Sequence, residues 1–462
     1  MDRVGSGQPE RGRRRPAADL RLGVPAMNAA PMTLLHPGPA ARRAIGGFNL
    51  VELMIAIVLG LLLSMGLVTL FNATNMTGRV QDALARIQEN GRYAVTRIES
   101  DLRMMNGQFR SNSNPMNWRP TANGPVYRSA APIINTTASL RFPDLVVEAP
   151  AGWPADTVYP LSSRFFVQGY ECGGGDCSPA VPAAPFLPDV GGGAGDRVRG
   201  ADVLTVRYQR GTGWSYRIVD ASVVPPQLEL VSATGDDPLN FESGDLALLS
   251  DCGGSTIVQV DVGGTVLTPT NLIEDDQFKP SPGTGACDPR VFNFSRDFVS
   301  VTYWLRLDAD PSVAGRLIPA LMRSEGDRTQ ELVQGVERLD FLYGVQSTGG
   351  NMTYLTADEV DSLGDNATCF PPANRFEYVL GTSYLEPGCM WRTIRSVEVH
   401  ALFNTVNDLN AMAEADTAYR YSVDGSADPE PPGATMPVTE LPSGRMLRKE
   451  FISLLSVRNG NQ

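Results

Sequence analysis

The feature that most constrains this chain of 462 residues is an apolar run of 24 residues, Phe48 to Phe71, with a single charged side chain, Glu52. A helix of that length spans the ~30 Å hydrocarbon core of a bilayer. Arg42 and Arg43 lie just before the run, and such basic residues stay on the cytoplasmic side. The run predicts one membrane-spanning helix with a cytoplasmic N-terminus and the remaining chain on the opposite side.

Glu52 is the unusual member of this run, because a carboxylate inside a membrane helix is costly and by default a functional candidate. A signal peptide places its cleavage site after the apolar run, whereas Gly46 and Gly47 precede it here. Cleavage after Gly47 leaves the helix on the mature chain, with the ammonium group of Phe48 one helical turn from Glu52. We expect these groups to pair, within one chain or between neighbours. The alternative is a plain anchor with an accidental Glu52.

This arrangement resembles the N-terminus of a type IV prepilin. The family signature joins a basic leader, a glycine at the cleavage point, Phe-Thr-Leu-x-Glu and an apolar helix. Residues 47–52 read GFNLVE, with Asn49 where threonine is commoner. The resemblance implies that a prepilin peptidase cuts between Gly47 and Phe48, that the new amine of Phe48 is methylated, and that Glu52 acts in subunit docking. Residues 1–47 are then a removed leader, long for the family.

Beyond Phe71 the sequence becomes amphipathic. Apolar residues recur mostly at the helical spacing of three and four, and Gly91 interrupts the series: Val80, Leu84, Ile87, Val95, Ile98 and Leu102. We therefore expect a helix over 48–107, transmembrane over 48–71 and amphipathic over 72–107. Its candidate weak points are Gly60, Gly66, Gly78 and Gly91, because glycine costs about 1 kcal/mol in a helix. The stretch QDALARIQENGRYAVTRIESDLRMMNG, 81–107, resembles the PilW family of minor pilins.

Residues 108–462 are predicted to form a β-rich body. Segment 108–200 has the composition of loops and short strands, and 331–345 is expected to start with an amphipathic turn and end as a strand. Further strands are predicted at 200–211, 246–253, 296–307, 317–325, 391–405 and 448–459. One helix followed mainly by strands indicates an α+β fold, with a mostly antiparallel sheet packed on the C-terminal half of the helix. ADVLTVRY, GVERLDFLYGV and SVRN also resemble PilW.

Six cysteines follow the apolar run, in Gly- and Pro-rich surroundings that suit disulfides in an oxidising compartment. The nearest-neighbour pairs are Cys172 with Cys177, Cys252 with Cys287, and Cys369 with Cys389. This is the preferred scheme, although the spacing leaves other pairings open. A zinc site is the weaker interpretation, since CGGGDC has no second close pair to complete it. We expect these loops and residues 345–390 to determine partner specificity.

The sequence shows no catalytic set, so we expect no enzyme activity, cofactor or metal. His400 lies in the predicted strand SVEVHALF, where a half-buried or surface histidine is the preferred interpretation. Acidic groups at Asp308 and Asp310, at 274–276 and at 424–430 lack the spacing of a calcium loop and are interpreted as solvated. The net charge of −12, more negative still without the basic leader, argues against general nucleic-acid binding.

The resemblance implies a minor pilin, low-copy or at the tip, that primes pilus assembly and supports adhesion, twitching motility or DNA uptake. Its partners would be other minor and major pilins, the prepilin peptidase, the inner membrane and the assembly machinery. The chain would reside in the inner membrane with a periplasmic body, and then in a surface pilus. The alternatives are a minor pseudopilin of type II secretion and a membrane-tethered binding module or adhesin; a tethered hydrolase is more distant.

Overall fold

The computed structural model falls into two compact units, Met1–Thr69 and Leu70–Gln462. The described residues are 49–105, 118–121, 124–127, 132–142, 145–149, 153, 156–173, 176–219, 223–231, 239–251, 254–273, 289–346, 351–363, 388, 390–391, 394–409 and 445–457.

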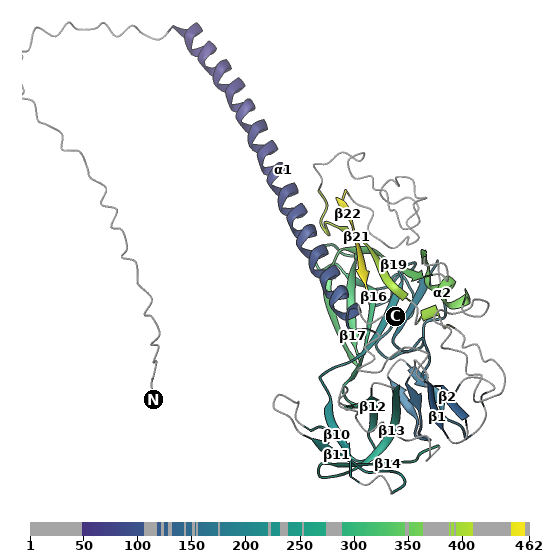
Figure 1. Cartoon of the computed structure of the whole chain (residues 1–462). Helices are drawn as coiled ribbons and strands as arrows, with labels where there is room; N and C mark the ends of the chain where they lie inside the picture. The colour runs from purple at the N-terminus through teal and green to yellow at the C-terminus, as the bar shows by residue number, and fades with distance from the viewer. Residues whose placement is uncertain are drawn as a thin grey trace, which may run out of the picture. The chain divides into compact units, whose positions relative to one another are not determined.

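The predicted N-terminal helix is confirmed as one continuous helix, α1, Leu50–Leu102 (Figure 1). Threonine side chains within it bond back to the helix backbone: Thr69 donates to the Gly66 carbonyl at 2.8 Å, and Thr74 to the Leu70 carbonyl at 2.9 Å. These bonds satisfy the hydroxyl groups without a break in the helix. The helix also runs without interruption through its glycines.

Two antiparallel sheets form the part of the body that carries α1, which confirms the α+β prediction. The first has the order β18-β17-β16-β9-β7-β8 and the second β20-β19-β21-β22. The strands of the first are β7 Val167–Cys172, β8 Cys177–Ser178, β9 Val203–Gln209, β16 Phe298–Ala309, β17 Leu317–Glu325 and β18 Arg328–Gln334. Those of the second are β19 Val336–Gln346, β20 Met352–Leu355, β21 Ile394–Asn404 and β22 Arg448–Ser456, and a short helix α2, Ala357–Leu363, follows β20.

The predicted amphipathic turn at the start of 331–345 is wrong. Residues 331–334 complete β18, and the chain passes to β19 and the second sheet at Gly335. Gly335 has φ 82°, a conformation that glycine adopts without steric cost. A Cβ there would lie 2.8 Å from Asn404 Oδ1. The polar residues that suggested a turn belong instead to an exposed edge strand.

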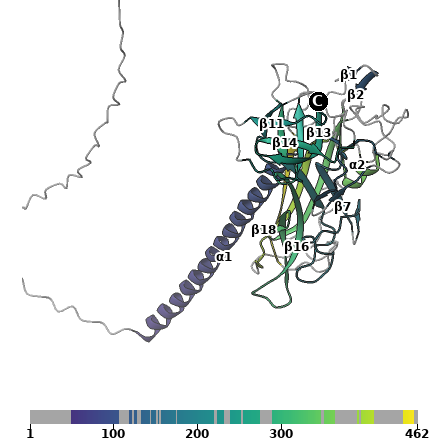
Figure 2. The ribbon, with the colours of Figure 1, turned by 90° about the horizontal axis from the view of Figure 1, so that it is seen from below.

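Between β9 and β16, which pair directly (Gln209 with Phe298), the chain inserts a small closed barrel. Its ring is β12-β15-β10-β11-β14-β13, closed because β13 also pairs with β12. The strands are β10 Trp214–Ile218, β11 Leu228–Val231, β12 Leu246–Asp251, β13 Gly254–Gly263, β14 Val266–Thr270 and β15 Arg290–Asn293. Figure 2 shows β11, β13 and β14 grouped together. The sequence predicted a strand at 246–253, but not this ring.

Side chains fill the barrel, as expected for one this small. Trp214, Tyr216, Leu249, Val258 and Val260 are among its buried interior residues. Alternate residues of the barrel strands belong to a second core, which also contains residues of short strands. These strands are β3 Ile133–Ile134, β4 Leu140–Phe142, β5 Leu145–Val147 and β6 Tyr159–Pro160; a separate hairpin joins β1 Trp118–Thr121 to β2 Gly124–Tyr127.

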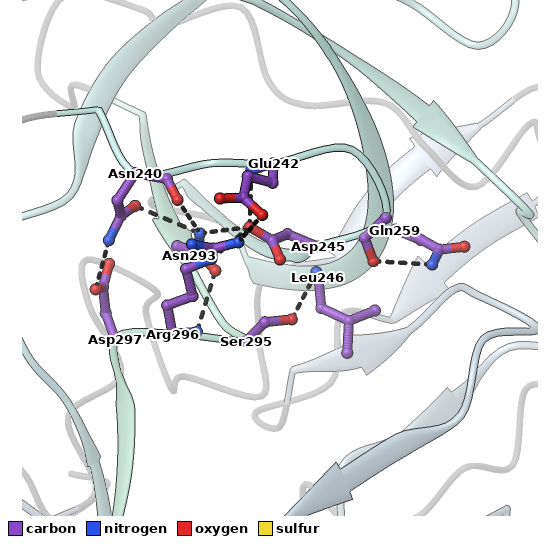
Figure 3. A network of polar contacts seen from close by, with 10 residues as sticks. Asn240, Glu242, Asp245, Leu246, Gln259, Asn293, Ser295, Arg296 and Asp297 are labelled. Atoms are coloured by element: carbon purple, nitrogen blue, oxygen red, sulfur yellow. Dashed lines mark hydrogen bonds and ion pairs between the residues drawn. The ribbon is translucent and has the colours of Figure 1, made fainter.

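A polar network fixes the segment that leads from the barrel back to the sheet (Figure 3). Asn293, fully buried, donates from its side-chain amide to Asp245 Oδ2 at 3.0 Å and to the Asn240 carbonyl at 3.2 Å. Arg296 forms ion pairs with Asp245 at 3.0 Å and Glu242 at 2.6 Å. Because the network joins the loop before β12 to the β15–β16 connection, it holds the barrel exit in one conformation.

Candidate assembly interface

The N-terminus of α1 has a cap built from the predicted cleavage motif. Asn49 Oδ1 lies 3.5 Å from the amide nitrogen of Val51, and the Asn49 carbonyl accepts from Glu52 N at 2.9 Å and Leu53 N at 3.1 Å. Asparagine is a preferred N-cap residue, so the departure from threonine suits the helix. Glu52 occupies the third helical position, where a carboxylate favours the positive end of the helix dipole. Gly47 and Phe48 lie outside the described residues.

The first part of α1 exposes its apolar side chains throughout. Large hydrophobic residues between Leu50 and Phe71 are each more than half exposed, Leu63 at 71%. Among the described residues, α1 is the one helix long and apolar enough to cross a membrane. Such a surface is compatible with a single membrane span or with packing against other apolar helices.

The second part of α1 packs on the body by one stripe. Its buried positions are Ile87, Gly91, Ala94, Ile98, Asp101, Leu102 and Met105. The apolar side chains among them share a core with β9, β16, β17, β19 and β21. Three residues of the predicted stripe, Ile87, Ile98 and Leu102, are buried, and Gly91 and Ala94 join them. The other three are only half-buried: Val80, Leu84 and Val95.

Gly91 is a packing position of this stripe. It is buried, and a Cβ built there would overlap the ring of Phe451 on β22. The ring of Phe451 in turn contacts Phe403 edge-on, with centroids 5.2 Å apart. Gly91 therefore lets an aromatic side chain approach the helix backbone. Gly91, an expected weak point of the helix, is instead a position where α1 lies close to β22.

Asp101, near the C-terminal end of α1, bonds the helix to three strands. It is 2% exposed. Its carboxylate accepts from Tyr208 Oη on β9 at 2.9 Å, Tyr303 Oη on β16 at 2.6 Å and Arg323 Nε on β17 at 2.7 Å. Tyr303 Oη also lies 3.1 Å from the Arg97 carbonyl of α1. We call these four residues, Asp101, Tyr208, Tyr303 and Arg323, the Asp101 clasp.

The clasp continues into a second carboxylate at its outer side. Arg323 Nη1 donates to Glu325 at 2.7 Å, and Glu325 also pairs with Arg210 at 2.7 Å. The hydrogen bond from Arg210, followed by that from Arg323, lowers the pKa of Glu325 to about 2. Burial, with Asp101 beside it, raises the pKa of Tyr303, so this phenol remains a donor to the carboxylate. The clasp is thus a buried charge pair whose members are hydrogen-bonded, the arrangement that such burial requires.

Cys172 and Cys177 form the predicted disulfide, which joins β7 to β8. Arg197 Nη1 lies 3.3 Å from Cys177 Sγ, and Asp202 accepts from the Cys172 amide at 2.9 Å. The other four cysteines, Cys252, Cys287, Cys369 and Cys389, lie outside the described residues, and their pairing stays a prediction.

A group of carboxyls lies next to this disulfide. Asp202 also accepts from the Phe341 amide at 3.1 Å, which ties β7 and β19 to the residue before β9. Burial, then the charges of Asp340 and Glu171, raises the pKa of Asp202 well above its ordinary value. Burial, then Asp340 and Asp358, raises the pKa of Glu171 to about 7, against the lowering effects of the Ala357 amide and Arg338. Glu171 therefore titrates near neutral pH.

We expect this group to make the fold more stable in mild acid. Folded Glu171 holds its proton up to about pH 7, whereas its ordinary pKa is 4.5, so folding takes up a proton between these values. The free energy of unfolding then falls as pH rises through that window. Thermal unfolding midpoints of wild type and Glu171→Gln, measured between about pH 8 and about pH 5, test this: wild type should gain stability on acidification and the variant should gain less. Equal slopes would contradict the assignment.

The other candidates singled out in the sequence have structural partners. His400 is 3% exposed, not half-buried or at the surface, with Nδ1 2.8 Å from Glu450 and Nε2 3.1 Å from Glu398. Asp310 is also buried rather than solvated, and bonds Ser312 and Arg316. Among the described residues, no group of His, Cys, Asp or Glu is arranged to hold a metal; 274–276 and 424–430 lie outside them.

Comparison with known proteins gives one family match. Residues 302–459 match the family described as type IV pilus-assembly protein W, PilW. The match runs from β16 through β22 and so includes Tyr303 and Arg323 of the clasp, and the strand that carries Phe451. No curated protein and no solved structure shows a match. Over this C-terminal region the chain is similar to the PilW family, which supports its involvement in type IV pilus assembly.

Proposed function

We propose that the protein is a minor pilin, cut between Gly47 and Phe48, that primes assembly of a type IV pilus from a low-copy or tip position. The observation that carries this proposal is the division of α1. Its first part exposes an apolar surface from Leu50 to Phe71, and its second part is fixed to the body by buried residues. One helix thus supplies both a surface for apolar helix partners and a firm attachment for the body.

The body supports a low-copy role rather than that of a repeating subunit. The barrel of 214–293, inserted between paired strands β9 and β16, makes it bulky. The partners would be other minor and major pilins, the prepilin peptidase and the assembly machinery. The chain would first lie in the inner membrane with its N-terminus cytoplasmic, and then in a surface pilus that serves adhesion, twitching motility or DNA uptake. The role is structural, not enzymatic.

Glu52 substitutions test this function. Because an ammonium group left unpaired in an apolar bundle costs several kcal/mol, Glu52→Ala should reduce the amount of protein in sheared fibres at least about tenfold. Membrane insertion and the protease-resistant body should be unchanged. Blots of sheared fibres and of membranes give both measurements.

Glu52→Gln separates charge from helix capping. A glutamine at this position still reaches the N-cap amide as glutamate does, but it cannot neutralise an ammonium group. The proposal predicts that both variants are lost from fibres. Normal incorporation of Glu52→Gln would show that capping suffices, and normal incorporation of both would refute the pairing of Glu52 with the new N-terminus.

A further inference from the structure

Among the described strands, none pairs with one edge of β22 at its C-terminal half. Val457 N donates to the Arg395 carbonyl at 2.8 Å, and β22 pairs antiparallel with β21, Ile452 opposite His400 and Leu454 opposite Glu398. Hydrogen-bonded and non-bonded pairs alternate in such a ladder. Ile452, Leu454 and Ser456 therefore direct their N–H and C=O groups away from β21, toward the outer edge.

The same three residues carry no charge, and Ile452 and Leu454 present an apolar surface. Ile452 is 54% exposed and Leu454 57% exposed, and both lie on the sheet face opposite Phe451, which packs on α1. Natural edge strands are usually protected by charges, by proline or by short length. β18 follows this rule with exposed polar residues at 328–331, and β20 with only four residues. From Phe451 to Ser456, β22 has neither a charge nor a proline.

The charged residues that precede this stretch have contacts within the fold. Arg448 pairs with Glu337 at 2.7 Å, Glu450 lies 2.8 Å from His400, and Lys449 lies over the ring of Phe451. The edge from Ile452 to Ser456 therefore has no charge of its own to attract a charged strand. It would bind best an extended segment that is uncharged and carries apolar side chains at alternate positions, the pattern of strand addition.

A second copy of the chain fits this edge poorly. Antiparallel pairing of two β22 edges has its two-fold axis perpendicular to the sheet, so both α1 helices would pack on the same face of the combined sheet. Their packed segments would then run in opposite directions. Two copies inserted in one membrane enter it from the same side, which this arrangement prevents.

We propose that the outer edge of β22, Ile452–Ser456, binds by strand addition an extended uncharged segment of another subunit of the pilus-assembly apparatus. The added strand would continue the sheet beyond β22, next to the helix that packs on Phe451. The choice of partner rests on the proposed minor-pilin function, whereas the docking edge rests on the geometry alone. The edge would thus select a neighbour in the assembled complex independently of the apolar part of α1.

Site-specific photo-cross-linking in piliated cells tests the proposal with the full-length chain. p-Benzoylphenylalanine at position 454 should yield an adduct with another pilus subunit, whose cross-linked peptide is uncharged over the contact. The same probe at position 330, on the exposed edge of β18, should not yield it. Ser456→Pro removes one outward N–H without loss of a β21 bond, and should reduce the adduct about tenfold. Ser456→Ala, which keeps the N–H, should leave it unchanged.

Several outcomes would overturn the proposal: no adduct at position 454, an adduct with a second copy of the chain, or an adduct that Ser456→Pro leaves intact. Protease resistance of the body checks that the proline variant is folded; if it is not, Ile452→Thr, which removes the apolar side chain but keeps the backbone, should weaken the same adduct. An uncut leader and no wild-type protein in sheared fibres, together with a position-454 adduct, would reject the minor-pilin function and retain the docking edge.

Discussion

Replacement of Asp101 by alanine should lower the free energy of unfolding by about 3–5 kcal/mol, the largest single-site effect expected in the body. The carboxylate accepts hydrogen bonds from Tyr208, Tyr303 and Arg323. Its removal leaves the Tyr208 hydroxyl and part of a buried guanidinium without this acceptor, and Tyr303 keeps only the Arg97 carbonyl. Urea unfolding of the full-length protein in detergent, followed by tryptophan fluorescence, measures the change.

Glu99→Ala is the matched control for Asp101→Ala. Glu99 is half a turn away on α1 and forms an exposed ion pair with Arg103. Exposed pairs of this kind contribute about 0.3–0.5 kcal/mol, so the control should be nearly neutral. Equal effects of the two substitutions would show that Asp101 does not hold the helix to the sheet.

Gly91→Leu should lower the free energy of unfolding by about 1–3 kcal/mol, although leucine is the better helix former. A side chain at this position overlaps the ring of Phe451, so either the ring or the helix must move. The added substitution Phe451→Ala should recover part of the loss, because it removes the group that the leucine overlaps. The same urea unfolding measurement applies to both.

Gly78→Leu provides the comparison within the same helix. A Cβ at Gly78 meets no atom within 4 Å, so helix propensity alone decides and the variant should be neutral or slightly more stable. If Gly91→Leu proved as well tolerated as Gly78→Leu, the close contact between α1 and β22 would be disproved.

Local patterns were sufficient to predict the helix and most strands of the sheets. The helical recurrence from Val80 to Leu102 and the alternation in 296–307 and 391–405 each depend on residues close in sequence. The prediction failed at 331–334, where charged and polar residues resemble a turn but form the exposed edge strand β18. A pattern of polarity does not distinguish a solvated turn from a strand at a sheet edge.

Long-range partners explain what the sequence did not reveal. Asp101 resembles a residue of a solvated helix face until Tyr208, Tyr303 and Arg323 surround it, at separations of more than 100 residues. His400 is buried for the same kind of reason, since Glu450 comes from the neighbouring strand. The barrel likewise depends on pairings between strands that are distant in sequence, β11 with β14, β10 with β15 and β12 with β15, which no single segment encodes.

The family match and the barrel occupy different parts of the chain. The match begins at Thr302, within β16, after the barrel. The barrel lies between two strands that pair directly, so it occupies a connection of the sheet rather than a part of it. Loops and insertions on a rigid scaffold commonly carry binding functions, and the barrel is accordingly where we expect contacts specific to this protein.

Cleavage between Gly47 and Phe48 is tested most directly by the N-terminal mass of the protein recovered from membranes, with and without the prepilin peptidase of the host. We expect a chain that starts at Phe48 with a methylated amine when the peptidase is present, and an uncut leader when it is absent. An intact leader in both samples would contradict it, since Glu52 would then lie in an ordinary membrane anchor with no new ammonium group to pair with.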